Sequence, residues 1–177
     1  MILHYFKKKE NKDKINAEFI YNNIIDYVKI LVNEKNLYIK KDLNSSFEIT
    51  SFLLCSLFYG VKVNSNGNNK KITQELMRLF INDLDHSFRI SGVSDMKIGK
   101  TVKLYVKKFY YRVKKLEVIF EEKKIDQYED YIENLDIFYE NDSKKKLILM
   151  LYNNSKILID GIKNDEIIKT NLFNSNN

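Results

Sequence analysis

The chain has 177 residues, a net charge of +6 and a hydrophobic fraction of 44%. That length fits one domain with a real core, and the apolar content excludes a disordered chain. Acids are interleaved with the lysines, so the basic excess is compatible with RNA or an anionic membrane without indicating either. A single cysteine, Cys55, excludes an intrachain disulfide and fits a reducing compartment.

The first residues do not resemble a secretory signal. Their apolar stretch, residues 1–6, is too short, and the lysines at 7–9 follow it rather than precede it. No apolar run approaches the roughly 20 residues that span a bilayer. We therefore expect a soluble or at most peripheral protein, with a basic N-terminal segment at 1–13 and one helical domain at 14–177.

Apolar residues recur at helical spacing along nearly the whole chain. We expect an all-α, single-domain bundle of about six to seven helices. In chain order the expected helices are about 14–33, 45–59, 70–91, 95–122, 126–139 and 143–160, followed by a weak last helix or a frayed tail. Loops are expected at 36–44 and 64–69. The helix at 143–160 is the least secure, because the apolar run 147–151 also fits a buried strand.

Local signals place the ends of these helices. Ser45 and Glu48 have the spacing of a capping box, and Gly60 is expected to end or bend the helix that follows. Gly92 suits the left-handed position after the third helix, with Ser94 or Asp95 as the next cap. Gly161 is expected to close the sixth helix.

The stretch 72–112 contains every arginine of the chain: Arg78, Arg89 and Arg112. The whole chain has 30 basic residues, so the other 27 are lysines. Arginine presents a planar donor fork that lysine cannot copy. We therefore interpret these arginines, with two of the five glycines (Gly92 and Gly99), as a sign of functional constraint.

The helix expected at 70–91 is apolar over more than half of its circumference. It is either central to the bundle or offers a second apolar strip, formed by Met77, Ile81 and Phe88. Asp83 falls inside the apolar arc, and a carboxylate removed from water needs a partner. We expect that partner on the next helix, among Lys100, Lys103 and Arg112, either as a structural ion pair or as a functional carboxylate. Asp85 and Arg89 are spaced for an exposed i,i+4 pair.

The next helix carries basic and aromatic residues away from its apolar stripe: Lys100, Lys103, Lys107, Tyr110, Tyr111 and Lys114. They form either a solvated face or a partner-binding surface with aromatic anchors. At least one of the adjacent rings at 109–111 must be exposed.

Catalytic signals are missing from the sequence. His4 and His86 are the only histidines and lie in no metal-ligand spacing. There is no glycine-rich phosphate loop and no nucleophile set. Cys55 lies in an apolar run, which predicts a buried core thiol. We expect a non-enzymatic protein with no cofactor and no metal.

The middle of the chain resembles the ubiquinol–cytochrome c chaperone family, which are assembly factors of respiratory complex III. The resemblance lies in Phe80-Ile81-Asn82-Asp83-Leu84-Asp85, Phe88-Arg89, Gly92-Val93-Ser94-Asp95, Lys100 and Phe109-Tyr110-Tyr111-Arg112, with Phe47-Glu48 before and Asn134-Leu135 after. It covers about 47–135.

The resemblance implies a helical chaperone that binds newly made cytochrome b, apo or partly haem-loaded, with a small co-chaperone or the ribosome as further partners. It places the protein at the cytoplasmic face of a bacterial inner membrane, or on the matrix side in a mitochondrion, and implies no DNA partner. The expected partner-binding residues are Asp83, Asp85, Phe88, Arg89, Asp95, Lys100, Tyr110 and Arg112. Alternatives are an RNA- or ribosome-binding module, favoured by the lysine-rich helix, and a helical domain that binds lipid or quinone.

Overall fold

The computed structural model describes residues 2–64, 70–122, 124–139 and 144–163. Within these ranges the elements are α1 (Ile2–Asn33), the 3-10 turn η1 (Lys35–Leu37), α2 (Leu43–Asn64), α3 (Lys70–Ile90), α4 (Asp95–Glu122), α5 (Ile125–Glu133) and α6 (Lys144–Lys163). Extended pairing in the same ranges is limited to one isolated antiparallel bridge, between Ile39 and Phe138. The expected all-α bundle is confirmed.

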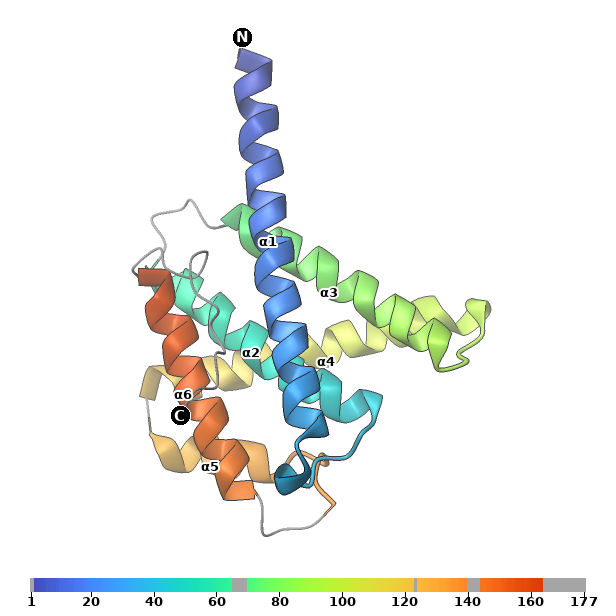
Figure 1. Ribbon diagram of the computed structural model, residues 1–177, viewed down its shortest axis with the longest axis vertical. Coiled ribbons are helices and arrows are strands. Elements are labelled where there is room, and N and C mark those ends of the chain that lie inside the picture. The colour runs from blue at the N-terminus through green and yellow to red at the C-terminus, as the bar shows by residue number, and fades with distance from the viewer. Residues whose placement is uncertain (1, 65–69, 123, 140–143, 164–177) are drawn as a thin grey trace.

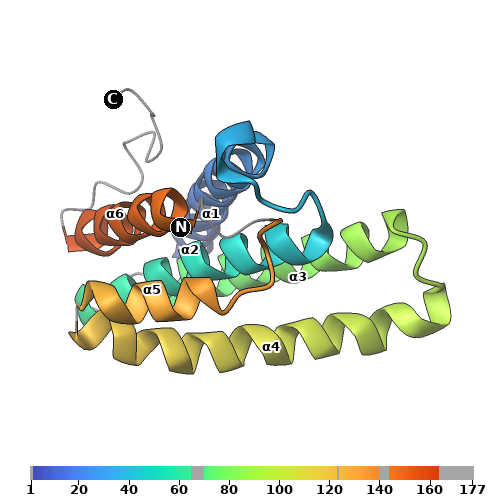
Figure 2. The same ribbon diagram turned by 90° about the horizontal axis from the view of Figure 1, so that it is seen from below.

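Helix α2 lies at the centre of the bundle and packs against α1, α3, α4 and α6. Seen from below, α4 runs along one outer edge, and α1 and α6 lie on the opposite side of α2 (Figure 2). The N-terminal half of α1 projects beyond the other helices (Figure 1). Among the described helices, none lies along the outer flank of α4 (Figure 2).

Aromatic rings fill the space where α2, α4 and α5 meet. The Phe52 ring on α2 lies 5.9 Å from Phe120 and 6.2 Å from Tyr128, both edge to face. Cys55, one turn along from Phe52, is 3% exposed, which confirms the buried core thiol. Burial raises the pKa of this thiol far above its usual range, which disfavours the reactive thiolate.

By length and hydropathy alone, α2 could cross a membrane, so the expectation that no segment approaches that length is wrong for this helix. Inside the bundle, 67% of its most apolar window is buried. Four other helices pack against α2, and a helix that is buried on most of its sides is apolar around most of its circumference.

Several helix ends differ from the expected ones. Helix α1 begins at Ile2 rather than near residue 14. Helix α2 begins at Leu43, and the Ser45 backbone donates to Asp42 Oδ1 at 2.7 Å. Asp42 therefore replaces Ser45 as the cap, and the capping box is wrong because Glu48 turns toward α4 instead. Gly60 lies inside α2, since the cost of one helical glycine, about 1 kcal/mol, is overridden by packing.

The C-terminal helices also differ in length. Helix α5 ends at Glu133, because the chain that follows turns back to pair with 38–40. There, Lys40 N donates to Ile137 O at 2.8 Å, and Tyr139 N donates to Tyr38 O at 2.9 Å. Helix α6 extends past Gly161 to Lys163, so the strand alternative is wrong. The loop expected at 64–69 and the tail after 163 lie outside the described residues, apart from Asn64 in α2.

Candidate functional site

The turn between α3 and α4 is fixed by backbone geometry. Gly92 has φ +84°, a conformation that favours glycine. Its N–H donates to Arg89 O at 3.1 Å, and Val93 N–H donates to Phe88 O at 3.0 Å. These two bonds form a Schellman motif, as expected for a glycine at this position. The Ser94 carbonyl accepts from Ile98 N at 3.1 Å, so Ser94 caps α4.

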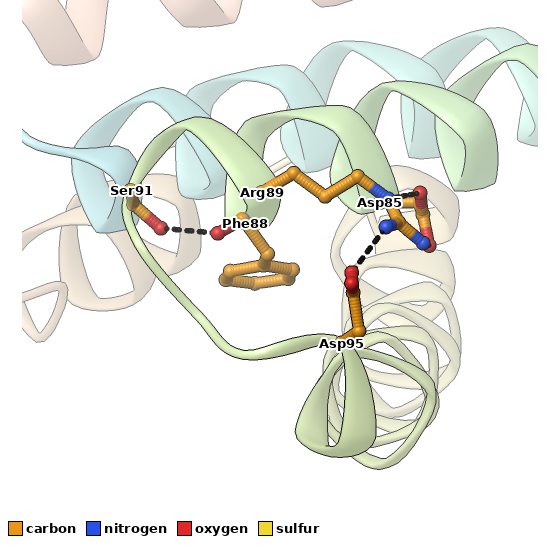
Figure 3. Close-up of polar contacts among 5 residues, drawn as sticks. All are labelled: Asp85, Phe88, Arg89, Ser91 and Asp95. Atoms are coloured by element: carbon orange, nitrogen blue, oxygen red, sulfur yellow. Dashed lines mark hydrogen bonds and ion pairs between the residues drawn. The ribbon is translucent and has the colours of Figure 1, made fainter.

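Arg89 bridges the two helices across this turn (Figure 3). Its Nε donates to Asp85 Oδ2 at 2.7 Å, and its Nη1 donates to Asp95 Oδ1 at 2.6 Å. The hydrogen bond to Asp85 and the charges of both carboxylates raise the pKa of Arg89 above its ordinary value. The fork thus connects the end of α3 to the first residue of α4. We name these three residues the turn cluster.

Phe88 lies beneath the turn cluster rather than on the surface. Its side chain is 4% exposed, and its ring lies 4.8 Å from that of Tyr105, edge to face. Phe88 was expected among the partner-binding residues, and in the structure its side chain packs inside the bundle. The helical period that places Phe88 on the same side of α3 as Met77 and Ile81 also places it four residues after the buried Leu84, and Phe88 is buried with Leu84.

Arg112 is not part of the turn cluster. It forms a two-pronged ion pair with Glu48 of α2, and the two side chains are 16% and 5% exposed. Its guanidinium lies 5.5 Å from the centre of the Phe47 ring. Burial lowers the pKa of Arg112, but the hydrogen bonds and charge of Glu48 outweigh this effect and raise it. The pair connects α2 to α4 inside the bundle.

Asp83 is held by α1, not by α4. The Tyr21 hydroxyl donates to Asp83 Oδ2 at 2.9 Å, and Tyr21 is 5% exposed. Burial, followed by the Asp83 charge and this hydrogen bond, raises the pKa of Tyr21 well above its usual range. The expected partners Lys100, Lys103 and Arg112 are wrong, because α3 turns this face toward α1.

An open groove lies between the end of α2, the first half of α3 and one flank of α4. We name it the α2–α3–α4 groove; its volume is about 760 Å³. The apolar residues that line it are Phe58, Val61, Met77, Ile81 and Tyr110, and the polar ones are Lys62, Thr73, Gln74, Arg78 and Asn82. The second apolar strip expected on α3 therefore exists, formed by Met77 and Ile81 without Phe88.

Two cations lie in this groove, and both are paired. Lys62 pairs with Glu117 of α4, and Arg78 Nε donates to Glu75 Oε2 at 2.7 Å. Tyr110 is 55% exposed and Tyr111 65%, which confirms that rings of the Phe-Tyr-Tyr run face outward. Sequence reasoning found Tyr110 but missed the contribution of α2, because the chain gives no sign of which helix lies beside it.

The expected site residues thus fall into separate regions. Asp85, Arg89 and Asp95 meet at the turn, and Lys100 is exposed farther along α4. Tyr110 lines the groove. The other three expected partner-binding residues, Asp83, Phe88 and Arg112, connect helices inside the bundle. Across the described residues there is no group of three or more His, Cys, Asp or Glu side chains that could hold a metal ion. What this arrangement offers is an apolar groove and an exposed charged turn, both suited to binding.

Three comparisons place the chain among known proteins. A family model described as ubiquinol-cytochrome C chaperone matches residues 35–128, more than half of the chain. A crystal structure of the Cbp3 homolog from Brucella abortus is similar with a TM-score of 0.69, over 95% of this chain and 93% of that one. The two sequences are 19% identical, so the likeness shows a shared fold. No curated protein sequence matches the chain.

Proposed function

Because this chain belongs to the ubiquinol–cytochrome c chaperone family, we propose that it is a non-enzymatic assembly factor that binds newly made cytochrome b. The α2–α3–α4 groove is the observation that carries this proposal. A client made of transmembrane helices exposes apolar side chains before it is inserted, and those side chains need an apolar surface. The groove offers one, because its lining residues Phe58, Val61 and Met77 pack against the core on one side and are only partly buried.

The chemistry of the groove suits such a client. Met77 and Ile81 form its α3 wall, and the unbranched thioether of methionine adapts to clients of irregular shape. Tyr110 adds a ring with an apolar body and a polar tip, as is common at binding surfaces. Lys62 and Arg78 are each paired with an acidic side chain. The edge of the groove therefore suits the polar ends of a client's helices better than a single unpaired anion.

The turn cluster is the second proposed contact. Asp85, Arg89 and Asp95 are exposed together, with Lys100 farther along α4. Arginine is retained here although an exposed ion pair contributes little to stability. We assign this cluster a role in orienting the client or a small co-chaperone. Asp83, Phe88 and Arg112 support the surface from inside the bundle.

Site-specific photo-crosslinking tests the groove. A benzophenone amino acid at Ile81 or Tyr110 should crosslink to cytochrome b in cells that synthesise it. The same probe at Leu149 or Tyr139, which are 53% and 66% exposed, is the matched control. Crosslinks at the control positions only, or at none of the four, would contradict the assignment of the groove.

Co-purification with cytochrome b tests the turn cluster. Arg89→Ala should weaken co-purification, and Arg89→Lys should not restore it, because lysine cannot bridge both carboxylates in the same geometry. Lys35→Ala, at an exposed lysine outside α3 and α4, is the control. Normal co-purification of both Arg89 variants would remove the turn cluster from the binding surface.

A peripheral position at the membrane belongs to the same proposal. Cytochrome b is finally inserted into a bilayer, so a chaperone that delivers it works at the bilayer surface. We place the protein at the cytoplasmic side of a bacterial inner membrane, with the matrix side of the mitochondrial inner membrane as the alternative. Fractionation of cells into membrane and soluble parts tests this position.

A further inference from the structure

The outer flank of α4 is the most one-sidedly charged part of the described structure. From Met96 to Leu116 the sequence contains eight basic residues and no acid. Six of these are exposed lysines: Lys97, Lys100, Lys103, Lys107, Lys114 and Lys115. At about 3.6 residues per turn, all six lie away from the buried stripe that contains Phe109 and Leu116. We name this surface the α4 lysine face.

Apolar side chains lie among these lysines on the same face. Met96 is 97% exposed, Tyr111 65%, Leu104 53% and Val118 51%. They recur at steps of seven or eight residues, which returns each to the same side of a helix. Helix α4 forms one outer edge of the bundle (Figure 2), and among the described residues α5 approaches this face only near Lys115 and Val118. A lysine-rich face with protruding apolar side chains is typical of helices that lie in a membrane interface.

We propose that the α4 lysine face docks on the surface of an anionic lipid bilayer. Lysines near such a surface are attracted to the negative headgroups, and no acid from 96 to 116 opposes them. Leu104 and Tyr111 then enter the boundary between headgroups and acyl chains, while the lysine stems reach back toward the phosphates. Asp130 of α5 lies in the same shallow groove as Lys115, so the part of α4 before Lys115 makes the main contact.

A bilayer explains this face better than a nucleic acid does. RNA would satisfy the lysines, but Met96 and Leu104 cannot stack on bases and would gain little against phosphates. In a membrane interface each of these side chains leaves water. A bilayer therefore contacts both the lysines and the exposed apolar side chains of the α4 lysine face.

This inference deepens the proposed function, because it names the surface through which the chaperone meets the membrane. Tyr110 lies between the two regions, in the α2–α3–α4 groove and next to Tyr111 on the lysine face. Docking through α4 would therefore hold the groove beside the bilayer. The experiments below contain no cytochrome b, so the lipid contact and client binding can fail independently.

Flotation with vesicles tests the contact. The full chain is mixed with vesicles of phosphatidylcholine alone, or of phosphatidylcholine with 30% phosphatidylglycerol added, at about 0.05 and 0.5 M salt. We expect binding to the anionic vesicles only, weakened at high salt. The variant Lys103→Glu/Lys107→Glu/Lys114→Glu should lose about a hundredfold or more in affinity. Its control, Lys35→Glu/Lys41→Glu/Lys71→Glu, changes net charge equally at exposed lysines elsewhere and should bind like wild type.

A tryptophan reporter fixes the orientation, because the chain has no tryptophan of its own. Emission from Tyr111→Trp should shift to shorter wavelength on anionic vesicles, and emission from Tyr139→Trp should not. The proposal is overturned if wild type ignores anionic vesicles, if both lysine variants lose binding equally, or if only Tyr139→Trp responds. Tighter binding to poly(U) RNA than to vesicles, lost in the same α4 variant, would reassign the face to nucleic acid.

Discussion

Removing Arg112 should reduce the stability of the bundle far more than removing any other arginine. Arg112 and Glu48 are 16% and 5% exposed, so Arg112→Ala leaves a carboxylate buried without its cation. Breaking a buried ion pair from one side typically costs about 3–5 kcal/mol. The substitution also removes the contact with the Phe47 ring and the donation from Nη1 to Lys108 O at 3.2 Å. This loss is a large part of the roughly 5–15 kcal/mol that stabilise a typical domain.

Urea unfolding followed by circular dichroism measures this loss. Arg112→Ala should lower the midpoint strongly with little change in slope. Arg89→Ala, whose ion pairs are exposed, should lower it much less. The double substitution Glu48→Leu/Arg112→Met should recover most of the loss, because an apolar pair of similar volume leaves no buried charge.

The contrast between the single and double variants shows whether the buried charge or the lost packing causes the instability. If Arg112→Ala costs less than about 1 kcal/mol, water reaches Glu48 and the pair is not desolvated in solution. If the double variant is as unstable as the single one, the lost packing of Arg112 on Phe47 explains the effect instead of the charge.

Three further predictions test other parts of the structure. Cys55 should not react with Ellman's reagent in the folded protein and should react fully in urea, since the thiol is buried and its pKa is raised; rapid reaction without urea would place it at the surface. Gly92→Ala should cost about 1–2 kcal/mol of unfolding free energy through its φ of +84°, with no clash, because no atom lies within 4 Å of the added Cβ. Tyr21 has a raised pKa, so its contribution to stability is complete below the unfolded value of about 10 and is lost as pH rises above it. Tyr21→Phe should therefore lose stability less steeply than wild type between pH 10 and 11, and equal slopes in urea titrations would show that Tyr21 also ionises in the folded state.

Local signals in the sequence determine much of the fold. Four residues of the apolar stripe predicted on α3 are buried at steps of four: Ile72, Leu76, Phe80 and Leu84. Gly92 also takes the left-handed conformation expected of it, because a Schellman turn depends only on residues within one helical turn. Helices and turns of this kind follow from interactions between near neighbours, so they can be predicted without knowing which helices pack together.

The partners of the charged residues could not be predicted in the same way. Asp83 meets Tyr21 across 62 residues of sequence, and Arg112 meets Glu48 across 64. Each pairing depends on which helix packs on which face, and several lysines were equally plausible partners by charge. The α2–α3–α4 groove is similar, because only its α3 wall is visible as an apolar strip. The exposed pair Asp85–Arg89 was predictable because both residues lie on one helix.

The central position of α2 has a consequence for synthesis of the protein. Helix α6, which covers one side of α2, is made only after residue 144, about 80 residues later than the end of α2. Until then, the segment Leu43–Asn64 emerges from the ribosome with the hydropathy of a membrane anchor and with part of its surface bare. A nascent or truncated chain that stops at residue 128, where the family match ends, would lack α6 and expose part of α2. Such a chain would itself present an apolar helix of the kind that the complete protein is proposed to bind.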